Sequence, residues 1–147
     1  MSKVIIIADD LTGANATGVL LARQGFKSAT FLNLSKYNKT ESNDLNIISI
    51  STDSRAINKN DAYKKVKNIV DFFKNDEVSL FAKRIDSTLR GNIGSEISAV
   101  LDNMDEDTYA VVVPAFPSSG RVCIGGFLMV TQVPLPDEGN AGTTTAY

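Results

Sequence analysis

The stretch IIIADDLTGA at residues 5–14 decides the fold of this chain. A run of β-branched apolar residues is typical of a strand buried on both faces, and here it ends in two adjacent carboxylates, Asp9 and Asp10. Small residues follow and open a helix that Asp10 or Thr12 could cap. Ligands of open parallel sheets bind in the crevice beyond the carboxyl ends of the strands. The stretch therefore predicts a strand, a turn and a helix that border a binding site.

Outward from this stretch, the apolar pattern predicts an α/β fold with three layers, α/β/α, around a mainly parallel, doubly wound sheet of the Rossmann-like kind. Apolar residues at helical spacing predict a helix over about 13–24, closed by Gly25, a second helix from near Asn58 and a third after Asn92. Residues 35–44 are polar and predict a surface loop. Short apolar runs predict strands at residues 3–8, 28–33, 46–51, 78–83 and 109–113.

Length and composition exclude several classes of protein. The 147 residues suffice for one domain with a single core. Lys and Arg number 15 against 17 Asp and Glu, so no basic surface for nucleic acid is expected. The single cysteine cannot form an internal disulfide, and no apolar run reaches the roughly 20 residues that span a bilayer. Without a signal peptide pattern, we expect a cytoplasmic protein with no membrane partner.

Polar segments follow four of the predicted strands. They are Asp9-Asp10, Thr52-Asp53-Ser54-Arg55, the segment Lys83 to Asn92 and the segment Pro114 to Arg121. If the strands are parallel, these segments converge at one edge of the sheet. Arginine binds a carboxylate through two parallel hydrogen bonds, and aspartate accepts hydrogen bonds from hydroxyl groups. Since the chain has no histidine, any proton acceptor must be a carboxylate, or less plausibly a lysine or tyrosine. The mixture predicts a site for a sugar acid.

Each segment also has a structural explanation. Adjacent aspartates after a strand often form turns and helix caps, and Asp53 and Arg55 could simply pair across a turn. The segment from Asp86 to Asn92 is harder to explain in this way, because it places six polar or glycine residues before a helix N-terminus, which attracts anions.

Four runs of the sequence together resemble a known family. ADDLTGAN at 8–15, STDSRA at 51–56, KRIDSTLRGNIGSEI at 83–97 and VVPAFPSSGR at 112–121 resemble, in order and spacing, the N-terminal domain of the four-carbon acid sugar kinases. These include D-threonate, D-erythronate and 3-oxo-tetronate kinases, which phosphorylate a four-carbon sugar acid with ATP and a divalent cation. The resemblance covers roughly residues 4–135. It implies an α/β domain that binds the acid, with the nucleotide bound by a separate C-terminal domain.

The resemblance also implies roles for individual residues. Asp86 or Asp10 is the candidate catalytic residue that orients and deprotonates the attacking hydroxyl, and the two stay unranked. Arg55 and Arg90 suit the carboxylate of the substrate. The full candidate substrate-binding set is Asp9, Asp10, Asp53, Arg55, Asp86, Ser87, Thr88, Arg90 and Asn92, with no metal ligand among them.

The chain departs from the family pattern in two respects. It contains neither a G-x-x-x-x-G-K-[ST] phosphate loop nor a G-x-G-x-x-G turn after a strand, so no ATP site is expected although the family uses ATP and Mg²⁺. Residues 1–135 are expected to form the sugar-acid-binding domain, and residues 136–147 an atypical tail left by a truncation or a frameshift. The nucleotide-binding domain, a partner in the family, is then missing. We expect the polypeptide alone to bind a sugar acid weakly without transferring phosphate.

Two other functions fit parts of the pattern. The chain could be a stand-alone sugar-acid-binding module or a remnant, and an exposed sheet edge could make it a homo-oligomer. A phosphoacceptor receiver domain would place Asp9, Asp10 and Asp53 around a magnesium ion. Such a domain also needs a lysine after the fifth strand, where this chain has Pro114.

Overall fold

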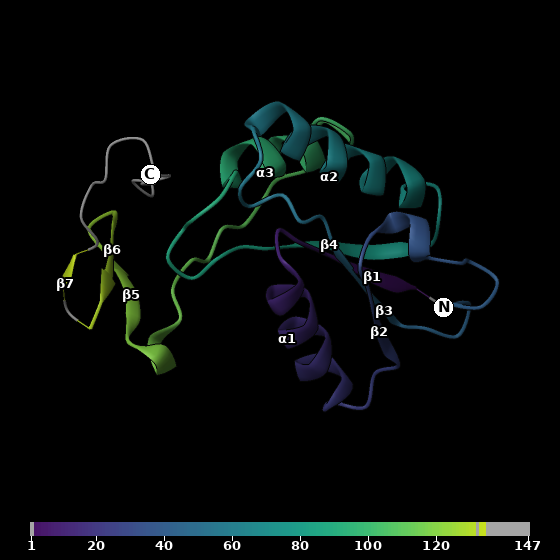
Figure 1. Cartoon of the computed structure of the whole chain (residues 1–147), viewed down its shortest axis with the longest axis horizontal. Coiled ribbons are helices and arrows are strands. Elements are labelled where there is room, and N and C mark those ends of the chain that lie inside the picture. Colours follow the sequence, from purple (N-terminus) through teal and green to yellow (C-terminus); the bar gives the residue numbers. More distant parts are fainter. Residues whose placement is uncertain (1, 132, 135–147) are drawn as a thin grey trace.

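The computed structural model describes residues 2–131, 133 and 134, which form two sheets and three α-helices (Figure 1). Short 3-10 helices cover Leu34–Lys36 and Pro117–Ser119. In chain order the main elements are β1 (Lys3–Ala8), α1 (Leu11–Ala22), β2 (Ser28–Phe31), β3 (Ile47–Ser51), α2 (Lys59–Phe73), β4 (Val78–Arg84), α3 (Ile93–Leu101), β5 (Arg121–Ile124), β6 (Phe127–Val130) and β7 (Val133–Pro134).

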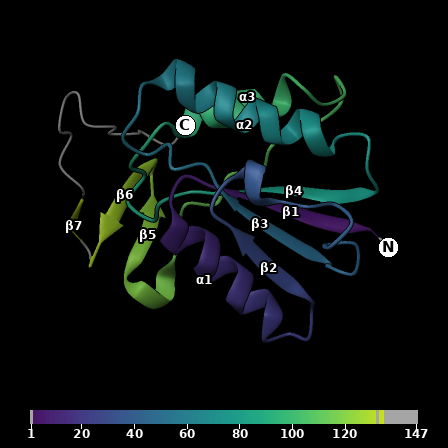
Figure 2. The same ribbon diagram turned by 45° about the vertical axis from the view of Figure 1, so that its right-hand side comes forward.

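The main sheet has the strand order β2-β3-β1-β4, and its strands pair in parallel (Figure 2). β1 lies between β3 and β4, where Ile5 pairs with Ile48 on one side and Phe81 on the other. The isoleucines of β1 and β3 are buried, which explains their unbroken apolar runs. Parallel pairing brings the carboxyl ends of these strands to one edge of the sheet.

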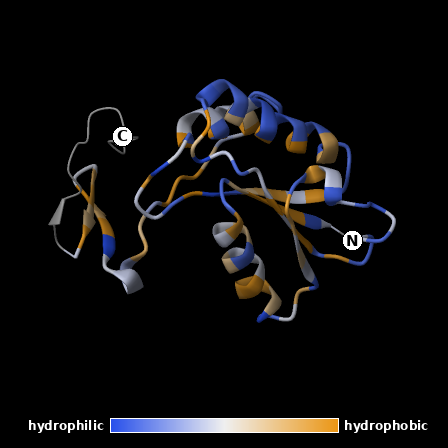
Figure 3. Ribbon diagram, in the orientation of Figure 1, coloured by the Kyte–Doolittle hydropathy of each residue, from blue (hydrophilic) through white to orange (hydrophobic). Residues whose placement is uncertain are grey.

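Helices cover both faces of this sheet (Figure 1). α1 packs against β1, β2 and β3 on one face, where Ser49 Oγ donates a 2.9 Å hydrogen bond to the carbonyl of Ala14. α2 and α3 pack on each other and cover the opposite face. Hydropathy colouring shows the outward side of α2 as mostly hydrophilic (Figure 3). The three-layer α/β/α prediction is confirmed. The core between α2 and the sheet includes Ile5, Ile7, Ile48, Ile50, Val66, Ile69, Val70 and Phe73.

The helix boundaries follow the predicted signals. The Asp10 side chain accepts a hydrogen bond from Gly13 N at 2.7 Å and caps α1. Gly25, at a φ of +93°, follows the end of that helix. Asn58 caps α2 through a 3.0 Å hydrogen bond from Asp61 N. Both caps satisfy backbone N–H groups that a helix leaves without partners in its first turn.

The strand predicted at residues 109–113 is wrong. These residues belong to no strand, and Tyr109, Val111, Val112 and Val113 are exposed. A cleft of about 650 Å³, lined by β4, α3 and residues 108–113, lies between this segment and β4. A strand needs hydrogen bonds from a neighbour along its length, and residues 109–113 pair with no strand of either sheet.

A second, antiparallel sheet of β5, β6 and β7 was not predicted. Its first hairpin turns at Gly125 and Gly126, both at positive φ, as two-residue hairpin loops require. Leu128 of β6 packs on Leu89 and Ile93, so this sheet contacts the segment that follows β4. No helix in the described part of the chain is long and apolar enough to cross a membrane. The predicted tail at 136–147 lies outside the described residues.

Candidate active site

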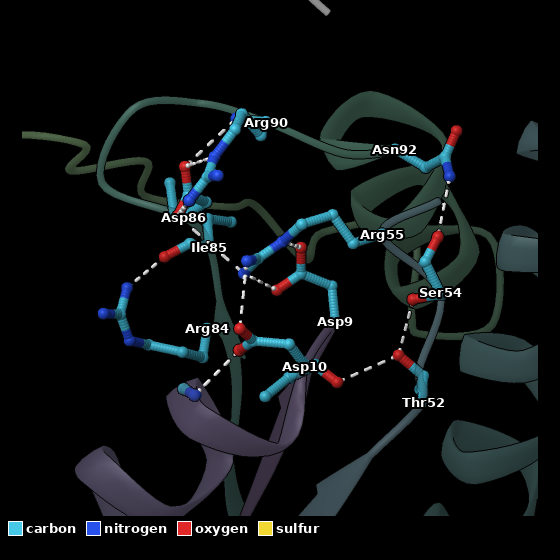
Figure 4. Close-up of polar contacts among 12 residues, drawn as sticks. Asp9, Asp10, Thr52, Ser54, Arg55, Arg84, Ile85, Asp86, Arg90 and Asn92 are labelled. Atoms are coloured by element: carbon cyan, nitrogen blue, oxygen red, sulfur yellow. Dashed lines mark hydrogen bonds and ion pairs between the residues drawn. The ribbon is translucent and has the colours of Figure 1, made fainter. Parts of the chain in front are cut away.

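A small cavity of about 210 Å³ lies at the carboxyl ends of β1, β3 and β4 (Figure 4). The register explains why three segments distant in sequence meet here, because Ala8 pairs with Ser51 on one side and Arg84 on the other. Six charged side chains line the cavity, three carboxylates and three guanidinium groups, which we call the charged cluster. Its members are Asp9, Asp10, Arg55, Arg84, Asp86 and Arg90.

Arg55 lies at the centre of the charged cluster. Its Nε and Nη2 donate to the two oxygens of Asp9 at 2.8 and 3.1 Å, a bidentate pair. Its Nη1 lies 2.9 Å from Asp10 Oδ2, and its Nη2 lies 3.8 Å from Asp86 Oδ1. The hydrogen bonds to Asp9 raise the pKa of Arg55 above its ordinary value, and Asp10 and Asp86 add to the effect. One guanidinium group therefore holds three strand-end carboxylates together.

Asp9 and Asp10 have different surroundings although they are adjacent. The Asp9 side chain is 3 % exposed, and Arg55 occupies both of its oxygens. The Asp10 side chain is 29 % exposed, with one oxygen on Gly13 N and the other on Arg55. Asp9 is thus a buried anchor for Arg55. Asp10 caps a helix and also presents its carboxylate to the cavity.

Asp86 organises the turn that follows β4. Arg90 donates to both of its oxygens, from Nε and Nη2 at 2.9 Å each, and Thr88 donates from its N and Oγ1. Burial opposes ionisation of Asp86, but the hydrogen bonds from Arg90 and Thr88 outweigh it and hold the pKa of this carboxyl well below its usual range. Asp86 therefore stays ionised at neutral pH and is a weak proton acceptor.

The backbone of these turns is closely fitted to the charged cluster. Leu89 and Gly91 have φ values of +60° and +99°. A Cβ on Gly91 would lie 3.0 Å from Asp9 Oδ2 and 3.4 Å from Arg55 Cγ. Glycine is required here both for its conformation and for the close approach of the backbone to the ion pair.

The structure brings together five of the nine predicted site residues, namely Asp9, Asp10, Arg55, Asp86 and Arg90. The other four do not line the cavity. Thr88 binds Asp86, and Ser87 is half-buried nearby. Asn92 donates to the carbonyls of Ser54 and Ile57, which braces the neighbouring loop. Asp53 is exposed and does not line the cavity, and among the described residues no three acidic side chains are grouped to hold a metal ion, as a receiver domain requires. The segment Pro114 to Arg121 also stays outside the cavity.

Arg84 is the cavity residue that the sequence interpretation missed. Its Nη1 donates to the carbonyl of Ile85, and among the described residues it has no carboxylate partner. The sequence does indicate this residue, because Arg84 lies in the run KRIDSTLRGNIGSEI, between the predicted strand and Asp86. The roles implied by the resemblance begin at Asp86, so Arg84 received none although the segment Lys83 to Asn92 was expected at the site.

The described residues of the site do not form a set of ligands for a metal ion. Residues 2–131, 133 and 134 contain no group of three or more Asp, Glu or Cys side chains arranged to hold one. The three carboxylates of the charged cluster face guanidinium groups instead.

Known proteins resemble this chain over most of its length. A family model described as "Sugar-binding N-terminal domain" matches residues 4–144. A D-erythronate kinase of Heliobacterium modesticaldum is 56 % identical over 135 residues, which are 92 % of this chain and 31 % of that protein. A D-threonate kinase of Salmonella typhimurium is 37 % identical over 90 % of this chain and 31 % of its own length. The chain thus spans about a third of these relatives.

Solved structures agree with these matches. A domain of unknown function from Bordetella bronchiseptica, described as a domain-swapped dimer with bound citrate, superposes with a TM-score of 0.87. It is 30 % identical, over 99 % of this chain and 39 % of that one. A second crystal form of the same protein gives a TM-score of 0.81 at 32 % identity, over 89 % of this chain and 33 % of that one.

Proposed function

This chain belongs to the family of sugar-binding N-terminal domains, and from that premise we propose that its charged cavity binds a four-carbon sugar acid as the substrate of an ATP-dependent kinase. The observation that carries the proposal is a cavity of about 210 Å³ with Arg84 and Asp10 on its wall. That volume is below the roughly 300 Å³ at which pockets for drug-sized ligands begin, and it suits a small acid. A hydroxylated anion needs both donors and acceptors, and the cavity offers both.

Arg84 and Arg90 are the best candidates for the substrate carboxylate. The guanidinium of Arg55 is occupied by Asp9 and Asp10, so it has little left to offer a ligand. Arg84 lacks a carboxylate partner among the described residues, and the Arg90 side chain is 63 % exposed despite its contact with Asp86. A ligand carboxylate would complete the charge pairing of the cavity.

Asp10 is the better candidate to receive a substrate hydroxyl. It is more exposed to the cavity than Asp86, and fewer donors surround it. Asp86 is held ionised by Arg90 and Thr88, which suits a role in orienting the turn. Asp10 would orient the hydroxyl and take its proton, as kinase aspartates do. Thr12 also lines the cavity and carries a hydroxyl for the same ligand.

The kinase activity itself is proposed for a longer assembly. ATP with a divalent cation would supply the phosphoryl group, and the relatives that carry the kinase names are about three times as long as the matched region. Incubation of this chain with ATP, Mg²⁺ and a four-carbon acid should give no ADP above background. ADP release would show that the chain transfers phosphate without a further domain.

Calorimetric titration tests the binding proposal. D-Erythronate and D-threonate are the first ligands to try, because kinases for both acids are among the relatives. We expect saturable binding of at least one of them. Erythritol, which has four carbons and four hydroxyls but no carboxylate, should give no heat of binding. Equal binding of erythritol, or no binding of any four-carbon acid, would contradict the proposal.

Arg84→Met tests the assignment of the carboxylate contact. Hydrogen bonds to charged groups contribute about 1.5–3 kcal/mol, so the variant should bind the acid about tenfold or more weakly in the same titration. Arg23→Met, which removes an arginine just beyond α1 and outside the cavity, is the matched control and should bind as the wild type does. Unchanged affinity in Arg84→Met would assign the carboxylate to Arg90.

A further inference from the structure

A buried ion pair lies behind the charged cluster and takes no part in the contacts proposed above. Lys83 Nζ is 2.6 Å from Glu96 Oε2, and the side chains are only 8 % and 1 % exposed. Lys83 is the penultimate residue of β4, and Glu96 lies in the first turn of α3. Lys83 also donates to the carbonyl of Arg84 at 2.9 Å. The pair thus connects α3 to the strand end that carries Arg84.

Glu96 is linked to the loop that carries Arg55. Its second oxygen, Oε1, accepts a hydrogen bond from Ser54 Oγ. Ser54 Oγ in turn lies 2.6 Å from Thr52 Oγ1 (Figure 4). The backbone N of Ser54 donates to the carbonyl of Asp9 at 3.0 Å. A buried polar chain therefore runs from α3 to the residue before Arg55 and to the backbone of its partner Asp9.

This loop requires support from outside its own backbone. Asp53 has a φ of +45°, a conformation that residues other than glycine rarely adopt. Lys65 Nζ holds the carbonyl of Thr52 at 2.8 Å, and Asn92 Nδ2 holds that of Ser54 at 2.9 Å. Strained backbone of this kind persists only where several contacts determine it together. Among the residues that the structure describes, Glu96 supplies the only contact from a charged group to the Ser54 side chain.

A buried ion pair is a poor device for stability alone. Taking two charges out of water usually costs as much as their attraction returns, so apolar residues would serve stability equally well. What an ion pair offers is a fixed direction for each hydrogen bond. We infer that Glu96, held by Lys83, is a positioning residue that fixes Ser54 and, through it, the guanidinium of Arg55, which holds the carboxylates of the charged cluster in place for acid binding. The ligand part of this inference rests on the proposed function.

Two variants interrupt the buried hydrogen bonds between Lys83, Glu96 and Ser54 at different points. Glu96→Gln leaves one acceptor oxygen for two donors, Lys83 and Ser54. Ser54→Ala removes the link to the loop but keeps the ion pair intact, so it serves even if Glu96→Gln fails to fold. Asp71→Asn is the matched control, because it breaks an ion-pair group on the outer surface of α2.

The first readout needs no ligand. In the free protein, the Nε–H resonance of Arg55 reports its bond to Asp9. We expect this resonance to move in Glu96→Gln and in Ser54→Ala and to stay unchanged in Asp71→Asn. An unmoved Arg55 resonance in folded Ser54→Ala would overturn the inference.

The second readout is the affinity for the four-carbon acid. Both variants should bind it about fivefold or more weakly. In an Arg55→Lys background the same substitutions should cause little further loss, because they act through Arg55. A full and additive loss in that background would overturn the positioning role. If the wild type binds no four-carbon acid while the Arg55 resonance still moves, the positioning stands and the proposed function fails.

Discussion

Arg55→Ala is expected to lower the free energy of unfolding by about 3 kcal/mol or more and to abolish binding of the sugar acid. The reason is the burial of Asp9, whose side chain is 3 % exposed and whose two oxygens both accept from Arg55. Without the guanidinium, a buried carboxylate has lost its counter-charge. Asp10 and Asp86 also lose the group that holds them at a common site. Urea unfolding and calorimetric titration measure the two effects.

Two further variants distinguish the effect of the unpaired Asp9 charge from a general loss of packing around Arg55. Asp9→Asn combined with Arg55→Met removes both charges and should recover part of the stability, though not the binding. Lys27→Ala breaks an exposed ion pair with Asp44 and should leave the free energy of unfolding nearly unchanged. An Arg55→Ala protein as stable as Lys27→Ala would show that Asp9 does not depend on Arg55.

Gly91→Ala is the second variant with a large expected effect. The backbone of Gly91 has a φ of +99°, which is unfavourable for any residue with a Cβ atom. An added Cβ would also lie 3.0 Å from Asp9 Oδ2 and 3.4 Å from Arg55 Cγ. We expect the free energy of unfolding to fall by about 2 kcal/mol and the affinity for the acid to fall with it. The Asp9–Arg55 pair must shift to make room, and the cavity changes shape.

The chain offers a close control for this substitution. Gly25 has a φ of +93°, nearly that of Gly91, but an added Cβ would meet nothing within 4 Å. Gly25→Ala should therefore show the cost of backbone strain alone, about 1–2 kcal/mol, with unchanged affinity. If Gly91→Ala binds the acid as well as Gly25→Ala does, the turn after β4 is not fitted to the charged cluster.

The layers of the fold could be predicted because their signals are local. The isoleucines of β1 and β3 are buried on both faces, and the stripe on α2 from Ala62 to Phe73 faces the sheet. Residues 109–113 carry an equally apolar run, yet no strand forms. Strand pairing depends on a distant edge of the sheet, which local composition does not encode. The hairpin at Gly125 and Gly126, in contrast, had a readable turn signal.

The site was predictable to the level of segments but not of individual side chains. Position after a strand predicted both Asp53 and Arg55, but the turn at Asp53 leaves its side chain exposed while Arg55 enters the charged cluster. Glu96, in contrast, was not predicted to support the site although it does. A glutamate in an amphipathic helix is expected on the solvent side, yet this one is buried with Lys83 as its partner. Such pairings arise from tertiary packing between β4 and α3.

Backbone and arginine side-chain NMR of the labelled chain during titration with D-erythronate tests the central claim most directly. The account predicts saturable shifts at Asp10–Gly13, at Arg84–Asp86 and at Arg90, the segments that line the cavity. Shifts confined to the cleft between β4 and residues 109–113, or no saturable shift with any four-carbon acid, would contradict it.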